Sequence, residues 1–307
     1  MNLLKTKTYF KVQNKSIWLL VATSAIASVL FSFMGAPFMR ALFVSTKSRV
    51  FWTTAVLLVG LMLVAGLAGL QSNYKIAETA VYVGAIWMTL GTYSELERRG
   101  TNWRGAGLIS LFAGVLLAVA GYFLILKNMV AADMLSETLE PLRTAMNKAF
   151  PNNQLEPGTL VKYLPGFFTA SLFGSLAMGF IFETKVTKMF KIQRARVASG
   201  LRWLEFRLPD TVIWLTLASL LILGLNSNQE ILKTAGINFL IIAAVAFLFQ
   251  GLAVVEFMTR FYRFGPFARM ATYVLIVLQL APFVILVGFV DYWADFRKLV
   301  RKKLKTT

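Results

Sequence analysis

Long hydrophobic stretches constrain this chain more than any other feature of its sequence. Residues 51–70, for example, run for about 20 residues without a charged side chain. A helix of that length crosses the roughly 30 Å hydrocarbon core of a bilayer. Hydrophobic residues make up 57% of the chain and charged residues only 15%, whereas about a quarter of the residues are charged in a soluble domain. The sequence therefore predicts an integral membrane protein.

About eight such segments can be recognised. They span residues 17–44, 51–70, 76–93, 107–126, 165–182, 210–225, 235–258 and 267–292. They lack the alternating pattern of barrel strands, and a lipid-facing backbone has to pair its own hydrogen-bonding groups, so helices are expected. The predicted fold is all-α, a polytopic transmembrane bundle forming a single integral membrane domain over residues 1–307. One or two of its helices are expected to be broken or re-entrant.

The chain is strongly basic, with a formal net charge of +18. The basic residues fall almost wholly between the hydrophobic segments and at the two ends of the chain. This pattern indicates the positive-inside rule and contact with anionic lipids of the bilayer, and it argues against a nucleic-acid partner. We therefore expect several crossings and a cytoplasmic N-terminus.

Charge also predicts the sides of the connecting regions. The N-terminal tail, the region 183–208 and the C-terminal tail 297–307 are basic and are expected in the cytoplasm. The neutral region 127–164 is expected outside, with an amphipathic helix in it. Five segments separate the N-terminal tail from region 183–208, and three separate that region from the C-terminal tail. An odd number of crossings places the regions that it separates on opposite sides of the membrane, so the three basic regions cannot all be cytoplasmic if every segment crosses. We expect segment 17–44 to fold back instead of crossing. For segment 267–292, a fold-back and an exception to the charge rule both stay open.

The chain contains no cysteine and no histidine. Their absence excludes disulfides, thiol nucleophiles, histidine bases, and zinc sites built from cysteine or histidine. No phosphate-binding loop, nucleophile elbow or zinc-protease motif is visible either. The sequence therefore predicts no enzyme, no catalytic residue, no metal and no cofactor.

Polar side chains inside apolar segments are functional candidates, because they are costly in lipid. Asn238, Gln250 and Glu256 lie in segment 235–258. The two amides either join helices or line a substrate cavity, and Glu256 is expected to pair with Arg260, four residues further along. Asp291 and Asp295, four residues apart, share one face of the last segment, and pairing with neighbouring Arg and Lys is favoured over cation binding. Trp203, Arg207 and Arg297 are expected at the cytoplasmic interface.

Several runs in the last third of the chain carry a family resemblance. They are Phe206-Arg207-Leu208-Pro209, the Asn238 segment, Phe249-Gln250-Gly251-Leu252-Ala253, and the run from Gly288 to Arg297 that contains Asp291-Tyr292-Trp293-Ala294-Asp295-Phe296. They resemble the YybS-like family of predicted bacterial membrane proteins, a domain of unknown function. The resemblance implies a multi-pass protein of the bacterial inner membrane. That family is distantly similar to the substrate-binding S components of energy-coupling-factor transporters. Gly288-Phe289-Val290-Asp291 departs mildly from the family's Gly-Leu-x-Asp.

Two functions follow from these observations. The first is a transport component that binds a small solute between its helices, and Asn238, Gln250 and Glu256 are its tentative substrate-binding residues. The second is a membrane scaffold or envelope-assembly protein that recruits a membrane or cytoplasmic protein through its basic face. A cavity lined by the polar residues favours the first, and an ordered cationic surface favours the second.

Overall fold

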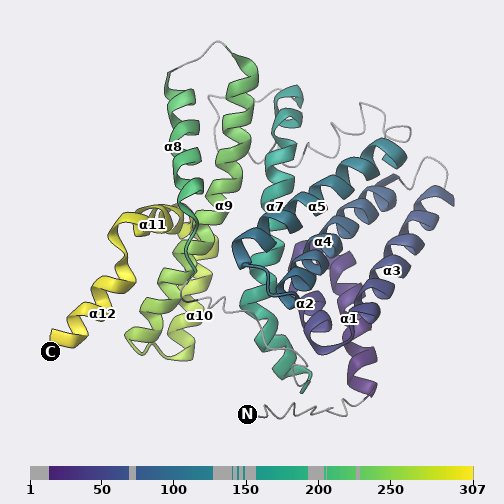
Figure 1. Cartoon of the computed structure of the whole chain (residues 1–307), viewed down its shortest axis with the longest axis horizontal. Coiled ribbons are helices and arrows are strands. Elements are labelled where there is room, and N and C mark those ends of the chain that lie inside the picture. The colour runs from purple at the N-terminus through teal and green to yellow at the C-terminus, as the bar shows by residue number, and fades with distance from the viewer. Residues whose placement is uncertain are drawn as a thin grey trace, which may run out of the picture. The chain divides into compact units, whose positions relative to one another are not determined.

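The structure, a computed structural model, describes residues 14–68, 74–126, 157–192, 206–225 and 229–306, and the single residues 140, 144, 148 and 204. These residues form helices joined by turns, and the described part of the chain contains no strand. Each of the predicted hydrophobic segments is helical, which confirms the all-α prediction (Figure 1). Most of region 127–164, including nearly all of its predicted amphipathic helix, lies outside the described residues; Glu140, Thr144 and Lys148 are helical.

Among the described residues, five helical stretches are long and apolar enough to cross a membrane. They are Ser16–Ser45, Ser48–Ala68, Trp103–Ile125, Val161–Met189 and Glu230–Phe261. The helices Asp210–Gly224 and Ala281–Ala294 are apolar but shorter. The chain is therefore a multi-pass membrane protein whose outward-facing apolar side chains suit contact with lipid.

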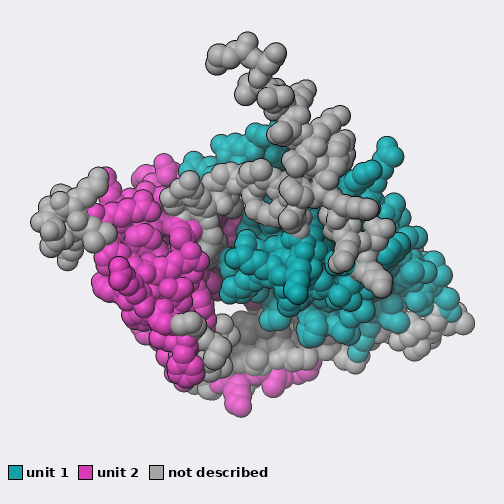
Figure 2. All heavy atoms as spheres, turned by 90° about the horizontal axis from the view of Figure 1, so that it is seen from below, with its two compact units in different colours: residues 1–129, 175–199 teal, residues 130–174, 200–307 magenta. Residues whose placement is uncertain are grey.

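The chain forms two compact units, coloured separately in Figure 2. The first unit contains residues 1–129 and 175–199, and the second contains residues 130–174 and 200–307. Helix α7 (Pro157–Met189) contributes its first half to the second unit and its second half to the first. Because α7 continues to Met189, the first residues of the basic region 183–208 lie on a helix.

The first unit is built around helix α4 (Tyr74–Arg98). In Figure 1, α4 lies between α3 (Ser48–Ala68) and α5 (Trp103–Gly121), and both pack against it. A π-helical turn, η2 (Tyr122–Leu126), follows α5. Trp87 and Leu90 of α4 are almost completely buried. Because neighbouring helices cover it, α4 tolerates polar residues such as Thr89 and Ser94, and it is not among the five stretches that are long and apolar enough to cross a membrane.

The first hydrophobic segment is broken, as the sequence predicts. Helix α1 (Asn14–Phe31) ends at a 3₁₀ turn, η1 (Ser32–Gly35), and helix α2 (Ala36–Ser45) follows with Pro37 in its first turn. Ser32 has a left-handed φ of 47°. The chain bends so sharply that a Cβ atom on Gly35 would lie 2.7 Å from the backbone of Ala27 and Ser28. Only glycine permits this close approach of the turn to α1.

The second unit is built around helix α9 (Glu230–Phe261), which packs against α8 (Asp210–Gly224) and α11 (Ala281–Ala294). The last hydrophobic segment begins as α10 (Pro266–Leu275) and passes through a π-helical turn, η4 (Ile276–Leu280), into α11. Pro282 has no N–H to donate, and its ring crowds the carbonyl four residues earlier, which explains an irregular turn at this place. A short amphipathic helix, α12 (Phe296–Thr306), completes the chain.

Candidate functional site

Gln250 lies at the centre of a buried polar network in the second unit. It is on α9 and is completely buried. Its carbonyl oxygen Oε1 accepts a hydrogen bond from the backbone N–H of Leu208 at 2.9 Å, and its amide nitrogen Nε2 donates to Asp291 Oδ2 at 3.2 Å. Both ends of the side-chain amide are therefore bonded to other parts of the protein.

Asp291 is the acceptor that joins three segments of this network. It lies in the last turn of α11, and only 1% of its surface is exposed. Besides Gln250, it accepts a hydrogen bond from Arg297 Nη2 at 2.7 Å, also on Oδ2, and one from the backbone N–H of Phe296 at 3.1 Å, on Oδ1. A buried carboxylate is tolerated only with such partners, because an unpaired charge is strongly disfavoured away from water.

Arg297 completes the network from the first turn of α12. Only 6% of its surface is exposed. Its Nη1 donates to the backbone carbonyls of Leu204 and Phe206, at 3.0 and 2.9 Å. One guanidinium thus fastens the start of α12 both to α11 and to the extended chain that precedes α8. A planar group with several N–H donors suits this geometry, which a lysine ammonium cannot reproduce.

Asp295 and Arg207 form the outer edge of the same region. Asp295 adopts a left-handed conformation that ends α11, and its Oδ1 accepts a hydrogen bond from the backbone N–H of Lys298 in α12. Arg207 lies 3.5 Å from Asp295 Oδ2, donates to the carbonyl of Tyr292 at 2.5 Å and covers the Tyr292 ring. The two acidic residues therefore each have an arginine partner. Trp203 lies outside the described residues.

Close backbone packing brings α9 and α11 together beside the network. A Cβ atom on Gly251 would overlap the carbonyl oxygen of Val284, and one on Gly288 would overlap the carbonyl oxygen of Phe247. Each helix thus places a glycine against a backbone carbonyl of the other. Small residues at such positions allow the close helix contacts that are typical of membrane proteins.

Asn238 joins α9 to α7 within the second unit. Its Oδ1 accepts a hydrogen bond from the backbone N–H of Gly166 at 2.6 Å, and its Nδ2 donates to the carbonyl of Lys162 at 2.8 Å. In a regular α-helix these two backbone groups, four residues apart, pair with each other. The amide therefore lies against α7 beside Pro165, which has no N–H and so removes one of the helix's own hydrogen bonds.

Glu256 belongs to a separate group near the end of α9. Its Oε1 pairs with Arg260 Nε at 2.6 Å, the ion pair expected from their spacing along the helix. Its Oε2 accepts a hydrogen bond from the hydroxyl of Tyr273 in α10 at 2.5 Å. Asn238, Gln250 and Glu256 thus lie at three different places along α9 and do not form one cluster.

The first unit contains a buried charged cluster that the sequence reasoning missed. Arg40 of α2 is 1% exposed and forms ion pairs with Glu97 of α4 and Glu183 of α7. It also donates to the hydroxyl of Ser94 at 2.5 Å and lies over the Phe180 ring. The signal in the sequence was an arginine inside the apolar segment 17–44. Its partners lie 54 to 143 residues away, so their identity could not be read from local spacing.

Within the described residues, no three or more acidic side chains come together as a group that could hold a metal ion. The buried carboxylates described above are instead bonded to arginines. These carboxylate–arginine contacts hold helices and connecting segments in place.

A sequence profile described as "Predicted membrane protein (DUF2232)" matches residues 16–292, which is most of the chain. The chain belongs to this family. No curated protein and no solved structure matches it.

In this DUF2232 member, the match includes Gln250 and Asp291 and ends at Tyr292. Asp295 and Arg297 lie beyond it. The runs that carry the resemblance in the sequence, residues 206–209, 249–253 and 288–297, meet at the network around Gln250. They lie far apart along the chain, and the hydrogen bonds of Gln250, Asp291 and Arg297 bring them together in the structure.

Proposed function

We propose that this protein is a non-enzymatic scaffold of the bacterial inner membrane, which recruits an anionic partner through a cationic cytoplasmic surface at its C-terminal end. The observation that carries the proposal is the attachment of α12. This helix is basic and amphipathic, and the buried Arg297–Asp291 pair fastens it to the membrane bundle. The bundle therefore holds the charges of α12 in one place.

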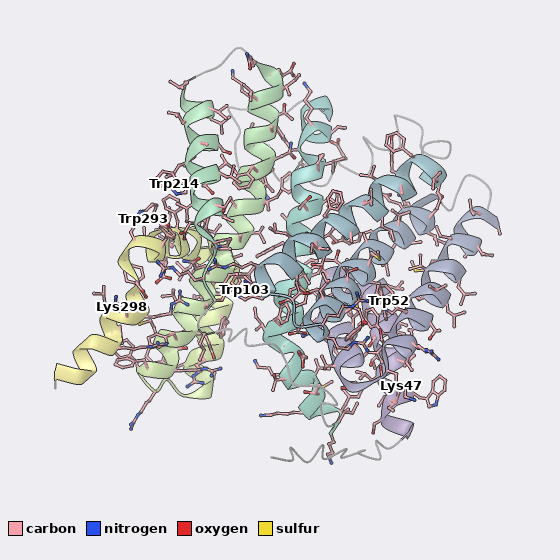
Figure 3. All side chains as sticks on the ribbon, viewed as in Figure 1. Lys47, Trp52, Trp103, Trp214, Trp293 and Lys298 are labelled. Atoms are coloured by element: carbon pink, nitrogen blue, oxygen red, sulfur yellow. The ribbon has the colours of Figure 1, made fainter. Side chains whose placement is uncertain are left out.

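The surface of α12 suits an anionic partner. Lys298 and Arg301 are exposed, and Leu299 beside them is 54% exposed. Figure 3 shows Trp293 of α11 and Lys298 of α12 on either side of the turn between the two helices. Arg301 also lies over the ring of Phe257, 5.4 Å from its centre, which ties α12 to α9. The apolar side of such a helix suits the membrane surface, and its exposed basic side chains attract a protein surface of opposite charge.

The polar residues of α9 favour the scaffold over the transport component. A solute site needs side-chain groups that are available to a ligand. Gln250 and Asn238 instead use both ends of their amides within the protein, and Glu256 accepts hydrogen bonds from Arg260 and Tyr273. The roles of all three are explained by helix packing without a solute.

One feature favours transport as a second candidate. The first and last hydrophobic segments are both interrupted, at η1 and at η4. Interrupted helices are common in transporters, where they bind the substrate. Under this reading the protein is a YybS-like transport component, similar to an S component, that binds a small solute.

The two functions are separated by purifying the full-length protein from native membranes and identifying what accompanies it by mass spectrometry. Under the scaffold proposal, a stoichiometric protein partner accompanies the wild type and is lost from the Lys298→Gln/Arg301→Gln variant. A matched control is Lys47→Gln/Arg49→Gln, which removes two exposed basic residues of the first unit; Lys47 is labelled in Figure 3. This control retains the partner.

If the Lys298→Gln/Arg301→Gln variant retains the same partner, the basic side of α12 is not the binding surface. A bound small solute in place of a protein partner, or a partner that is itself an ATPase, supports the transport component instead.

A further inference from the structure

Gln279 is a polar residue near the middle of the last hydrophobic segment. It is 12 residues from Phe267 and 13 residues from Tyr292. At 1.5 Å per residue, that is roughly 18–20 Å from either end of the segment, whereas half of the hydrocarbon core is about 15 Å thick. In a membrane-spanning α10–α11, Gln279 thus lies deep in the bilayer.

The side chain of Gln279 faces away from the other helices of the second unit. The opposite side of α10–α11, with Val284, Gly288 and Asp291, is buried. Gln279 itself is exposed and lies in the π-helical turn η4. Its outward neighbours on the same side are apolar and exposed: Leu275, Phe283, Leu286, Val290 and Trp293.

Contact with lipid suits the apolar residues of this outward face, but it does not suit Gln279. Hydrocarbon chains offer no hydrogen bonds, and the amide of glutamine has one acceptor oxygen and two N–H donors. In the part of the chain that the structure describes, the side-chain amide of Gln279 has no hydrogen-bond partner. Polar residues in such positions join helices within membranes.

We propose that the Gln279 face of α10–α11 is the interface of a homodimer in the membrane, in which the Gln279 amides of two copies hydrogen-bond to each other. A second copy inserted with the same orientation places its own Gln279 at the same depth. The amide both donates and accepts, so it complements itself across a two-fold axis along the membrane normal. The face carries no charge that would repel its copy. This inference does not depend on the scaffold proposal.

The absence of cysteine permits a direct test in native membranes. Single cysteines are introduced into the full-length chain at positions on the face, as Phe283→Cys and Leu286→Cys, which leave Gln279 in place. The control is Leu116→Cys, an exposed apolar position on α5 of the first unit. A disulfide forms only when the two Cα atoms come within about 7 Å. At least one position on the face is expected to give a disulfide-linked dimer, and the control is expected to stay monomeric.

The role of the amide is tested by adding a second substitution to the cross-linking variant. Gln279→Leu is expected to lower the dimerisation constant about 3- to 30-fold, the range measured for hydrogen bonds between membrane helices. Gln279→Asn, which keeps an amide, is expected to retain most of the dimer. The proposal is overturned by a monomer at both face positions, by equal cross-linking at Leu116, by cross-linking to a different protein, or by an unchanged dimer with Gln279→Leu.

Discussion

At the scale of single residues, the buried polar side chains of the second unit hold separate segments of the chain together through hydrogen bonds. Gln250, Asp291 and Arg297 each bond to more than one part of the chain, and all three are buried. The sequence identifies Gln250 and the two aspartates as unusual because they interrupt or border apolar runs. It does not identify their partners, because Gln250 and Asp291 are 41 residues apart.

Removing the carboxylate of the network should destabilise the protein strongly. Asp291→Ala leaves the buried guanidinium of Arg297 without its counter-charge, and such a loss costs about 3–5 kcal/mol. Thermal unfolding of the full-length protein in a mild detergent measures the effect. Glu230→Gln is the control: it removes the exposed Lys162–Glu230 pair and should leave the unfolding temperature nearly unchanged. Similar losses in both variants would contradict the structural role of Asp291.

The amide of Asn238 should stabilise the contact between α7 and α9. Asn238→Leu has nearly the same size but leaves the N–H of Gly166 and the carbonyl of Lys162 without this partner, at a cost of about 1–3 kcal/mol. The control is Thr53→Val, which removes an exposed hydroxyl that bonds only to its own helix. We expect the leucine variant to unfold at a clearly lower temperature than this control; equal unfolding temperatures would show that the bonds of Asn238 contribute little.

At the scale of helices, the decisive features are the places where backbones come close. The sequence predicts that the first segment breaks near Gly35-Ala36-Pro37, and the structure places a sharp bend there. Proline and glycine give this signal locally, through the lost N–H and the missing Cβ. The contact of Gly251 with α11 gives no comparable local signal, because glycine is also ordinary in an apolar helix.

Adding one methyl group at this contact should separate α9 from α11. Gly251→Ala places a Cβ atom on the carbonyl of Val284, and overpacking of this kind costs about 1–3 kcal/mol or more. The matched control is Gly60→Ala in α3, where a Cβ atom meets nothing within 4 Å. That control should be neutral or stabilising by up to about 1 kcal/mol through helix propensity. Thermal unfolding in detergent compares the two, and equal stability would contradict the close contact.

At the scale of the whole molecule, the membrane topology decides which surfaces can meet a partner. The scaffold proposal requires α12 in the cytoplasm together with the basic region 183–208. A reporter domain attached after Thr307 tests this placement.

A reporter fused after Thr307 is expected to report the cytoplasm, and a second reporter inserted between residues 149 and 156 is expected to report the outside. Enzymatic reporters that are active on only one side of the membrane make the measurement. The physical reason is the cost of moving the basic residues of α12 across the bilayer, which the positive-inside rule reflects. A C-terminal reporter on the outer side would contradict both the charge rule at this tail and the scaffold proposal.

Sequence alone determined that this chain is a bundle of membrane helices, and it located their ranges to within a few residues for most segments. It could do so because the cost of leaving backbone groups unpaired in lipid acts on each apolar segment separately. Only the tertiary structure decided that Gln250 bonds to Asp291, that Arg40 pairs with Glu97 and Glu183, and that Gln279 points outward. These facts depend on which helices become neighbours and on how each is rotated, and no local pattern of residues encodes either.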